Sequence, residues 1–158
     1  SEVGPDFPII LRWSQWKQQD FAARLAPTPQ SLEAFLKPLI DAGVDAFHCS
    51  QRRFWEPEFD DSDMNLAGWV KKLTGMPTIT VGSVSLDQDF VSQPSEGDGA
   101  TSEPASIDRL LEMMDRGDFD LVAVGRALIA NPDWPKVVRS GDTSALQAYN
   151  KDLLAELA

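Results

Sequence analysis

Four short apolar runs, each followed by helix-forming sequence, predict an α/β fold. The runs are Pro8–Ser14, Val44–Ser50, Pro77–Val84 and Phe119–Val124. Near-continuous apolar character is typical of buried parallel strands, and a helix between strands is the connection that parallel pairing needs. We therefore predict four consecutive βα units, with neighbouring parallel strands in sequence order and helices on one side. Eight units, over roughly 250 residues, normally close a barrel, so an open four-stranded sheet is the alternative on pattern alone.

Capping signals and apolar stripes define the first two helices. Thr28 can cap a helix, Pro29 fits its first turn, and Gly43 ends it. A second helix is expected from about Asp63 to Leu73. The stripes at helical spacing are Leu32, Phe35, Leu36, Leu39 and Ile40 in the first helix, and Leu66, Trp69, Val70 and Leu73 in the second.

The second half of the chain contains a segment that is unlike the rest. Residues 87–103, and Ser92–Ser102 above all, are rich in Ser, Gly, Pro and acidic residues, which predicts a mobile loop without a core. A third helix is expected between Pro104 and Gly117, and a short one before Asn131-Pro132. The side chains expected to face inward are Ile107, Leu110, Leu111 and Met114 in the third helix, and Leu146, Tyr149, Leu153 and Leu157 in a final amphipathic helix.

Charge and cysteine content restrict the possible partners and compartment. The formal net charge of −11 gives a surface that repels nucleic-acid phosphates and anionic lipid headgroups, so neither partner is expected. No apolar run approaches the roughly 20 residues that span a bilayer. The single cysteine, Cys49, excludes an intrachain disulfide and favours a reducing, cytoplasmic compartment. With one histidine and one cysteine in the chain, no zinc site is expected.

Two of the strand-like runs end in a glycine beside a polar or charged residue. These pairs are Gly82-Ser83 and Gly125-Arg126. Glycine lets the backbone approach a ligand closely, and arginine offers a planar, permanently charged fork suited to phosphate. On a parallel barrel, the loops after the last two strands commonly bind phosphate. Two ordinary tight turns with a solvated arginine are the alternative.

Alternation along the first two strands turns Arg12 and His48 toward the strand mouth. Leu11 and Trp13 suit packing against helices, which leaves Arg12 on the inner face. There it either meets an anion or forms a structural salt bridge, because a buried guanidinium needs a partner. His48 is either a substrate contact and proton donor or a hydrogen-bonded core residue. Cys49 points toward the helices and is interpreted as a packing residue.

A charged and aromatic loop, residues 51–59, follows the second strand at the same mouth. Arg53 and Trp55 are the candidates for substrate binding in this loop. The alternative is that its aromatic residues only anchor the loop over the helix ends.

Three segments resemble, in the same order, the old yellow enzyme family of flavin-dependent ene-reductases: Pro8–Ser14, Pro77–Val84 and Val124–Trp134. The resemblance covers nearly the whole chain but only the second half of the family's TIM (β/α)8 barrel, which implies that residues 1–158 form a single carboxyl-terminal half-barrel domain. It further implies FMN as cofactor, with the phosphate between Gly82-Ser83 and Gly125-Arg126 and with Arg12 beside the pyrimidine edge of the flavin. NADH or NADPH would be the reductant, and an activated alkene the hydride acceptor.

The family's catalytic motifs do not occur in this sequence. Its substrate-anchoring histidine/asparagine pair, the glutamine that meets the flavin and the proton-donating tyrosine come from the earlier half of its barrel. No catalytic residue is therefore assigned, and the chain is expected to be inactive alone. The expected partner is an amino-terminal half-barrel or a second copy of the chain. A non-catalytic phosphate-binding half-barrel that pairs with another chain, or a different phosphate-binding barrel enzyme, are the alternatives.

Overall fold

The computed structural model describes residues 4, 6–17, 19–87 and 101–157. Within this part, one parallel sheet contains β1 (Ile10–Trp13), β2 (Ala46–Ser50), β3 (Thr78–Val81) and β4 (Leu121–Val122), in the order β1-β2-β3-β4. All three pairings are parallel, which confirms the predicted α/β fold of four consecutive units. The strands are shorter than the apolar runs that predicted them.

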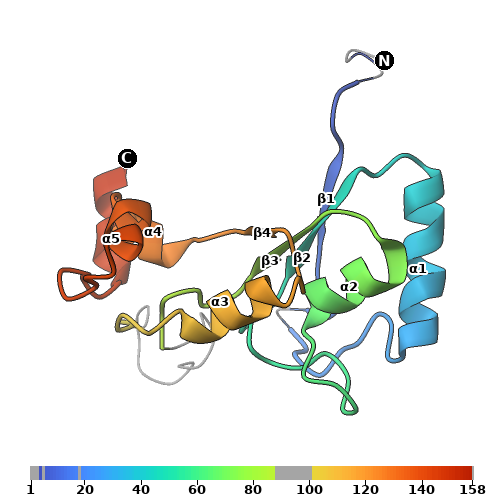
Figure 1. Ribbon diagram of the computed structural model, residues 1–158, viewed down its shortest axis with the longest axis horizontal. Coiled ribbons are helices and arrows are strands. Elements are labelled where there is room, and N and C mark those ends of the chain that lie inside the picture. Colours follow the sequence, from blue (N-terminus) through green and yellow to red (C-terminus); the bar gives the residue numbers. More distant parts are fainter. Residues whose placement is uncertain (1–3, 5, 18, 88–100, 158) are drawn as a thin grey trace.

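The helices α1 (Pro29–Asp41), α2 (Leu66–Thr74) and α3 (Asp108–Asp115) lie along one side of the sheet (Figure 1). Thr28 caps α1 as expected, in a reciprocal arrangement with Ser31. The second helix begins later than predicted because Asn65 caps it, accepting a bond from the Gly68 N–H at 2.9 Å. The core between the helices and the sheet includes Leu32, Leu36, Phe47, Cys49, Leu66 and Val70, all fully buried.

Two predictions for the later helices were wrong in part. In α3, Leu110 and Met113 are buried, whereas Leu111 and Met114 are 47% and 39% exposed. Leu110 faces inward as expected, but the buried face continues to Met113, at i+3, rather than to Leu111 and Met114. The final segment is a 3-10 helix, η1 (Lys151–Leu157), rather than a longer amphipathic helix, and Tyr149 lies before it. Two helices, α4 (Arg126–Ala130) and α5 (Trp134–Ser140), precede η1.

Although β4 has only two residues, polar contacts fix its position beside β3. The Asp120 carboxylate accepts a bond from the Thr78 N–H at 2.9 Å and pairs with Lys71 of α2 at 2.8 Å. These contacts place the start of β4 against β3. The chain then runs from β4 to α4, which lies at the far end of the molecule (Figure 1).

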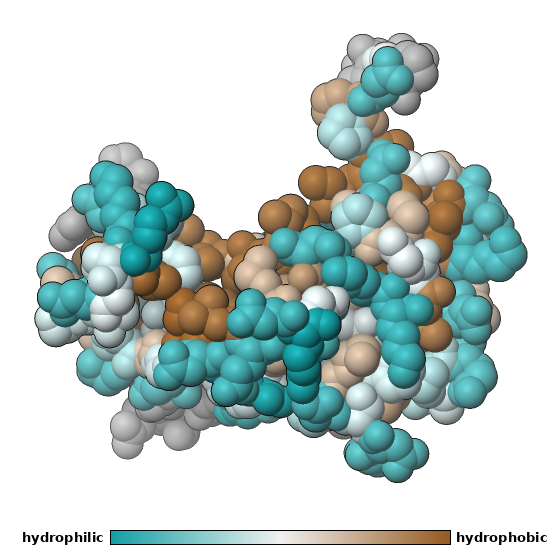
Figure 2. Space-filling model, in the orientation of Figure 1, coloured by the Kyte–Doolittle hydropathy of each residue, from teal (hydrophilic) through white to brown (hydrophobic). Residues whose placement is uncertain are grey.

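The opposite side of the sheet is uncovered in the described part of the chain. Its strand residues include Ile10 and Leu121, which are 55% and 57% exposed. Phe7 and Ile9, just before β1, are also exposed. Figure 2 shows hydrophobic surface along the concave side, between the amino-terminal strand and the carboxyl-terminal helices. Among the described residues, no helix is long and apolar enough to span a membrane.

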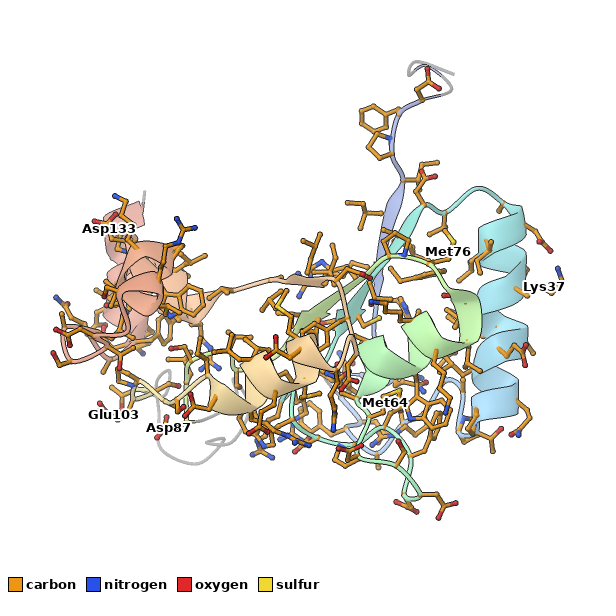
Figure 3. All side chains as sticks on the ribbon, in the orientation of Figure 1. Lys37, Met64, Met76, Asp87, Glu103 and Asp133 are labelled. Carbon is orange, nitrogen blue, oxygen red and sulfur yellow. The ribbon has the colours of Figure 1, made fainter. Side chains whose placement is uncertain are left out.

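The predicted mobile loop falls mostly on residues 88–100, which lie outside the described residues. The flanking residues Asp87 and Glu103 are held together (Figure 3): the Asp87 N–H donates to the Glu103 carbonyl at 3.1 Å, and the Glu103 N–H donates to the Asp87 carboxylate at 2.9 Å. Ser102, which the prediction placed in this loop, is fully buried. The two described residues that flank this segment, Asp87 and Glu103, are therefore bonded directly to each other.

Candidate functional site

The carboxyl ends of the four strands surround a cavity of about 220 Å³. All five residues predicted to bind the cofactor contribute to it: Arg12, Gly82, Ser83, Gly125 and Arg126. The remaining lining residues are Trp16, Gln51, Arg52, Val81, Val84, Leu86 and Ala123. The parallel order of the sheet brings the two glycine pairs together, because β3 and β4 are neighbours.

Three arginines line this cavity in a chain whose formal net charge is −11. Arg12 and Arg126 were expected here, whereas Arg52 was assigned only to the charged loop after the second strand. Arg52 also lies over the Phe21 ring, with its guanidinium carbon 4.8 Å from the ring centroid. A signal for it existed in the sequence, since it follows the end of a strand by two residues. The site is thus suited to an anionic group.

The Arg126 guanidinium is held by serine hydroxyls on two other segments. Its Nη1 donates to Ser102 Oγ at 2.8 Å, and its Nη2 donates to Ser83 Oγ at 3.4 Å. Ser83 Oγ in turn donates to the Arg52 carbonyl at 3.1 Å. The Ser83 hydroxyl thus donates to the loop after β2 and accepts a bond from Arg126.

The two glycines at the strand ends, Gly82 and Gly125, differ in how closely the rest of the protein packs against them. Gly82 has φ +142°, and a Cβ there would lie 2.7 Å from the Gln51 carbonyl oxygen, so close packing of the loop after β2 requires glycine. At Gly125, a Cβ would meet no described atom within 4 Å. Space beside Gly125 is thus available to a ligand rather than filled by the described protein.

Arg12 and His48 are adjacent on the open face of the sheet, paired in register across β1 and β2. Arg12 points inward as expected but is exposed, and its Nη2 donates to Ser50 Oγ at 3.4 Å. It makes no ion pair with any described residue, so the alternative of a salt bridge to a neighbouring strand is not seen in this part of the chain. His48 Nε2 has no hydrogen-bond partner among the described residues. Burial lowers the pKa of His48, and the charge on Arg12 lowers it further, which favours a neutral imidazole.

Comparisons with known proteins show what the sequence and the fold of this chain are similar to. The chain is 29% identical over 147 residues to the NADH oxidase of Thermoanaerobacter brockii, which covers 88% of the chain and 19% of that relative. The old yellow enzyme homologue from Zymomonas mobilis has the same fold over 91% of the chain and 34% of its own, with a TM-score of 0.57 and 16% identity. No protein-family model matches.

The chain is therefore similar in sequence to part of that NADH oxidase and in fold to part of that old yellow enzyme homologue. It spans about a fifth of the curated relative and a third of the structural one. Its four parallel βα units correspond to part of an old yellow enzyme barrel. The uncovered apolar face of the sheet is the face that would line the interior of such a barrel.

The three predicted substrate-binding residues are not brought together. His48 lies on the open sheet face, Arg53 lines a separate cavity and pairs with Glu56 at 2.7 Å, and Trp55 lines a third with Ser83. Trp55 also packs edge-on against Phe54, with ring centroids 5.0 Å apart. The loop thus shows the anchoring contacts of the alternative interpretation, and none of the three residues lines the cavity at Arg126.

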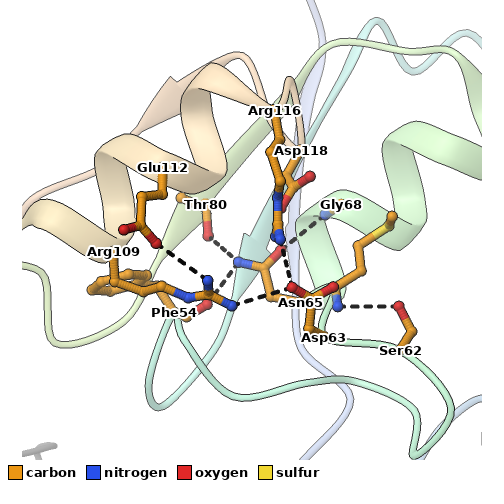
Figure 4. A network of polar contacts seen from close by, with 11 residues as sticks. Phe54, Ser62, Asp63, Asn65, Gly68, Thr80, Arg109, Glu112, Arg116 and Asp118 are labelled. Carbon is orange, nitrogen blue, oxygen red and sulfur yellow. Dashed lines mark hydrogen bonds and ion pairs between the residues drawn. The ribbon is translucent and has the colours of Figure 1, made fainter.

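Asn65 fixes the loop that carries Arg52 and Arg53 (Figure 4). This fully buried side chain caps α2, and its Nδ2 donates to the Phe54 carbonyl at 2.8 Å and to Thr80 Oγ1 at 3.2 Å. It therefore joins the loop, the helix and β3 at one point. Sequence reasoning missed this role because the two donor contacts are set by the tertiary fold. An exposed cluster beside it, in which Asp63 pairs with Arg109 and Arg116, links the same region to α3 (Figure 4).

Proposed function

We propose that this chain supplies the carboxyl-terminal half of an FMN-dependent NAD(P)H oxidoreductase. The observation that carries the proposal is the gathering of three arginines and two glycine strand ends around one cavity at the carboxyl edge of a parallel sheet. This edge is where barrels of the type bind phosphate groups. The homology to an NADH oxidase and the fold of an old yellow enzyme homologue support the choice of chemistry.

The residues present fit the phosphorylated end of FMN. Arg126 would pair with the phosphate, and the open space at Gly125 gives the phosphate room near the backbone. Gly82 would keep the backbone at the end of β3 in its place. Arg12, which has no ion pair among the described residues, would place a fixed positive charge at the pyrimidine edge of the flavin ring. The chemistry that bound FMN would supply is hydride transfer from NADH or NADPH to an activated alkene.

Because one face of the sheet is open, the proposal includes a second half-barrel that covers this face, which we call the complementary body. Exposed Ile10 and Leu121 lie on the face that closing a barrel would bury. An amino-terminal half-barrel, or a second copy of the chain, would supply the further strands. No catalytic acid is assigned to this chain, so we expect no alkene reduction without the complementary body.

A non-catalytic half-barrel that binds phosphate compounds is the second candidate. It is favoured by the absence of an assignable catalytic residue in the sequence. Alkene-dependent oxidation of NAD(P)H by the chain with its complementary body supports the oxidoreductase, whereas phosphate-compound binding without such turnover supports the second candidate.

Flavin titration of single variants tests the assigned roles. Arg126→Ala should weaken FMN binding by about 1.5–3 kcal/mol, the size of a hydrogen bond to a charged group. Gly125→Val should do at least as much harm by filling the space beside the phosphate. Arg12→Ala should leave more of the binding intact but lower the reduction potential of the bound flavin. Arg139→Ala, which removes an exposed arginine from α5, is the matched control. Unchanged FMN affinity in the Arg126 and Gly125 variants would show that the phosphate binds elsewhere.

A further inference from the structure

Arg126 is fixed by residues that are far from it in the sequence. Ser102 Oγ accepts its Nη1 bond at 2.8 Å, and Ser102 is fully buried. The guanidinium carbon lies 5.7 Å from the centroid of the Tyr149 ring, which is 6% exposed. One residue thus bonds the edge of the guanidinium, while the other provides an aromatic surface for it.

Ser102 and Tyr149 are themselves joined. The Ser102 N–H donates to the Tyr149 carbonyl at 2.9 Å, and the Tyr149 N–H donates to the Ser102 carbonyl at 2.9 Å. This reciprocal bridge is the contact between the chain entering α3 and the segment that precedes η1. It fastens together the two residues that contact Arg126.

The same segment is tied back to the helix that begins with Arg126. At the end of α4, Asn131 Nδ2 donates to the Gln147 carbonyl at 3.0 Å, and the Gln147 N–H donates to Asn131 Oδ1 at 2.8 Å. The helix that carries the Arg126 backbone is therefore bonded to the segment that carries Tyr149, which in turn is bonded to Ser102. We call Ser102 and Tyr149, with their backbone bridge, the arginine clamp.

A fixed arginine binds an anion better than a mobile one. An arginine side chain has many rotamers, and much of this rotamer entropy is lost when its charge is held in one place. If the protein orders the side chain beforehand, the ligand does not bear that cost on binding. Neither Ser102 nor Tyr149 lines the cavity, so the clamp can hold the guanidinium in place without contacting the ligand.

We propose that Ser102 and Tyr149 are positioning residues that aim Arg126 at the phosphate, and that they thereby set the preference for a phosphorylated flavin over riboflavin. The inference rests on the proposed FMN site. It assigns a role to two residues that the resemblance to old yellow enzymes did not mark. Neither residue acts on the ligand directly.

The test compares FMN with riboflavin, which lacks the phosphate, by fluorescence titration of the full chain and its variants. Ser102→Ala should weaken FMN binding about 5- to 20-fold, as expected for loss of one bond to a charged group, and leave riboflavin binding within about twofold. In an Arg126→Ala background, Ser102→Ala should change FMN binding by no more than about twofold, because coupled residues are non-additive. Ser140→Ala, an exposed serine in α5, is the control.

Tyr149 provides an independent pair of variants. Tyr149→Leu should lower FMN affinity selectively, and Tyr149→Phe should restore it because the ring and the backbone bridge remain. Equal losses for FMN and riboflavin, or additive effects of Ser102→Ala and Arg126→Ala, would overturn the clamp. If the unmodified chain prefers FMN and Ser102→Ala keeps the full preference, the clamp is wrong while the FMN site stands. No preference for FMN in the unmodified chain would overturn the proposed function itself, and the clamp with it.

Discussion

Glu58 gives the chain a stability that depends on pH near neutrality. Its side chain is 10% exposed, and Oε1 accepts a bond from Gln15 Nε2 at 3.0 Å with Arg24 Nε 3.9 Å away. Burial raises the pKa of this carboxyl from 4.5 to about 7, although the charge on Arg24 and the bond from Gln15 act in the opposite direction. Burial raises the pKa of the Cys49 thiol, and the negative charge on Glu58 raises it further.

The sign of the effect follows from proton linkage. Because the folded state binds the Glu58 proton more tightly, its contribution to stability is present below pH 4.5 and is lost as the pH rises to about 7. The difference corresponds to about 3 kcal/mol, since one pKa unit is about 1.4 kcal/mol. Glu58→Gln removes the buried charge, so it should stabilise the chain by up to about 3 kcal/mol at pH 8.5 relative to its effect at pH 4.5.

Urea unfolding of the unmodified chain and of Glu58→Gln at the two pH values measures this difference. Glu56→Gln is the control, because Glu56 lies on the same loop with a side chain that is 45% exposed and paired with Arg53. It should show a much smaller difference between the two pH values. If Glu58→Gln changes the free energy of unfolding equally at pH 4.5 and 8.5, the carboxylate is not disfavoured by burial and the reasoning fails.

Three further predictions concern the parts that support the site. Asn65→Ala should cost about 2–4 kcal/mol in urea unfolding, through loss of a helix cap and two buried hydrogen bonds, and N65D should retain only the cap. Gly82→Ala should destabilise the chain by about 1–3 kcal/mol, and by more than Gly117→Ala does. Both glycines have positive φ, but only at Gly82 would a Cβ lie 2.7 Å from the Gln51 carbonyl oxygen. Equal losses of stability in the two variants would show that close packing does not require glycine at position 82. Cys49 is fully buried, so a thiol reagent should modify it only as the chain unfolds, and rapid modification under native conditions would contradict that burial.

Periodicity predicted the parts of the fold that depend on local pattern. The alternation of Leu11, Arg12 and Trp13 gave the correct faces of β1, and the capping residue Thr28 gave the start of α1. It could not give the exposure of Arg12, because this depends on what covers the inner face of the sheet. The prediction for α3 was right for Leu110 but wrong for Leu111 and Met114, because all three are apolar and only packing decides which of them is buried.

The candidate site was predictable only where its residues lie at strand ends. Gly82 and Gly125 are found from their position after apolar runs, and the parallel order of the sheet then places them together. Ser102 carries no such signal, since it lies in a polar segment that is poor in apolar residues. Its hydrogen bond with Arg126 joins residues that are 24 positions apart in the sequence. The backbone bridge between Ser102 and Tyr149 is likewise not specified by any local pattern.

The central claim is that the cavity between the ends of β3 and β4 holds the phosphate of FMN, and ³¹P nuclear magnetic resonance of FMN reports on that group directly. Adding the chain should shift and broaden the phosphate signal. Arg126→Ala should largely abolish the change at the same protein concentration, whereas Arg139→Ala should preserve it. If flavin fluorescence shows that the ring binds while the phosphate signal stays as it is in free FMN, the phosphate does not enter this cavity and the account is contradicted.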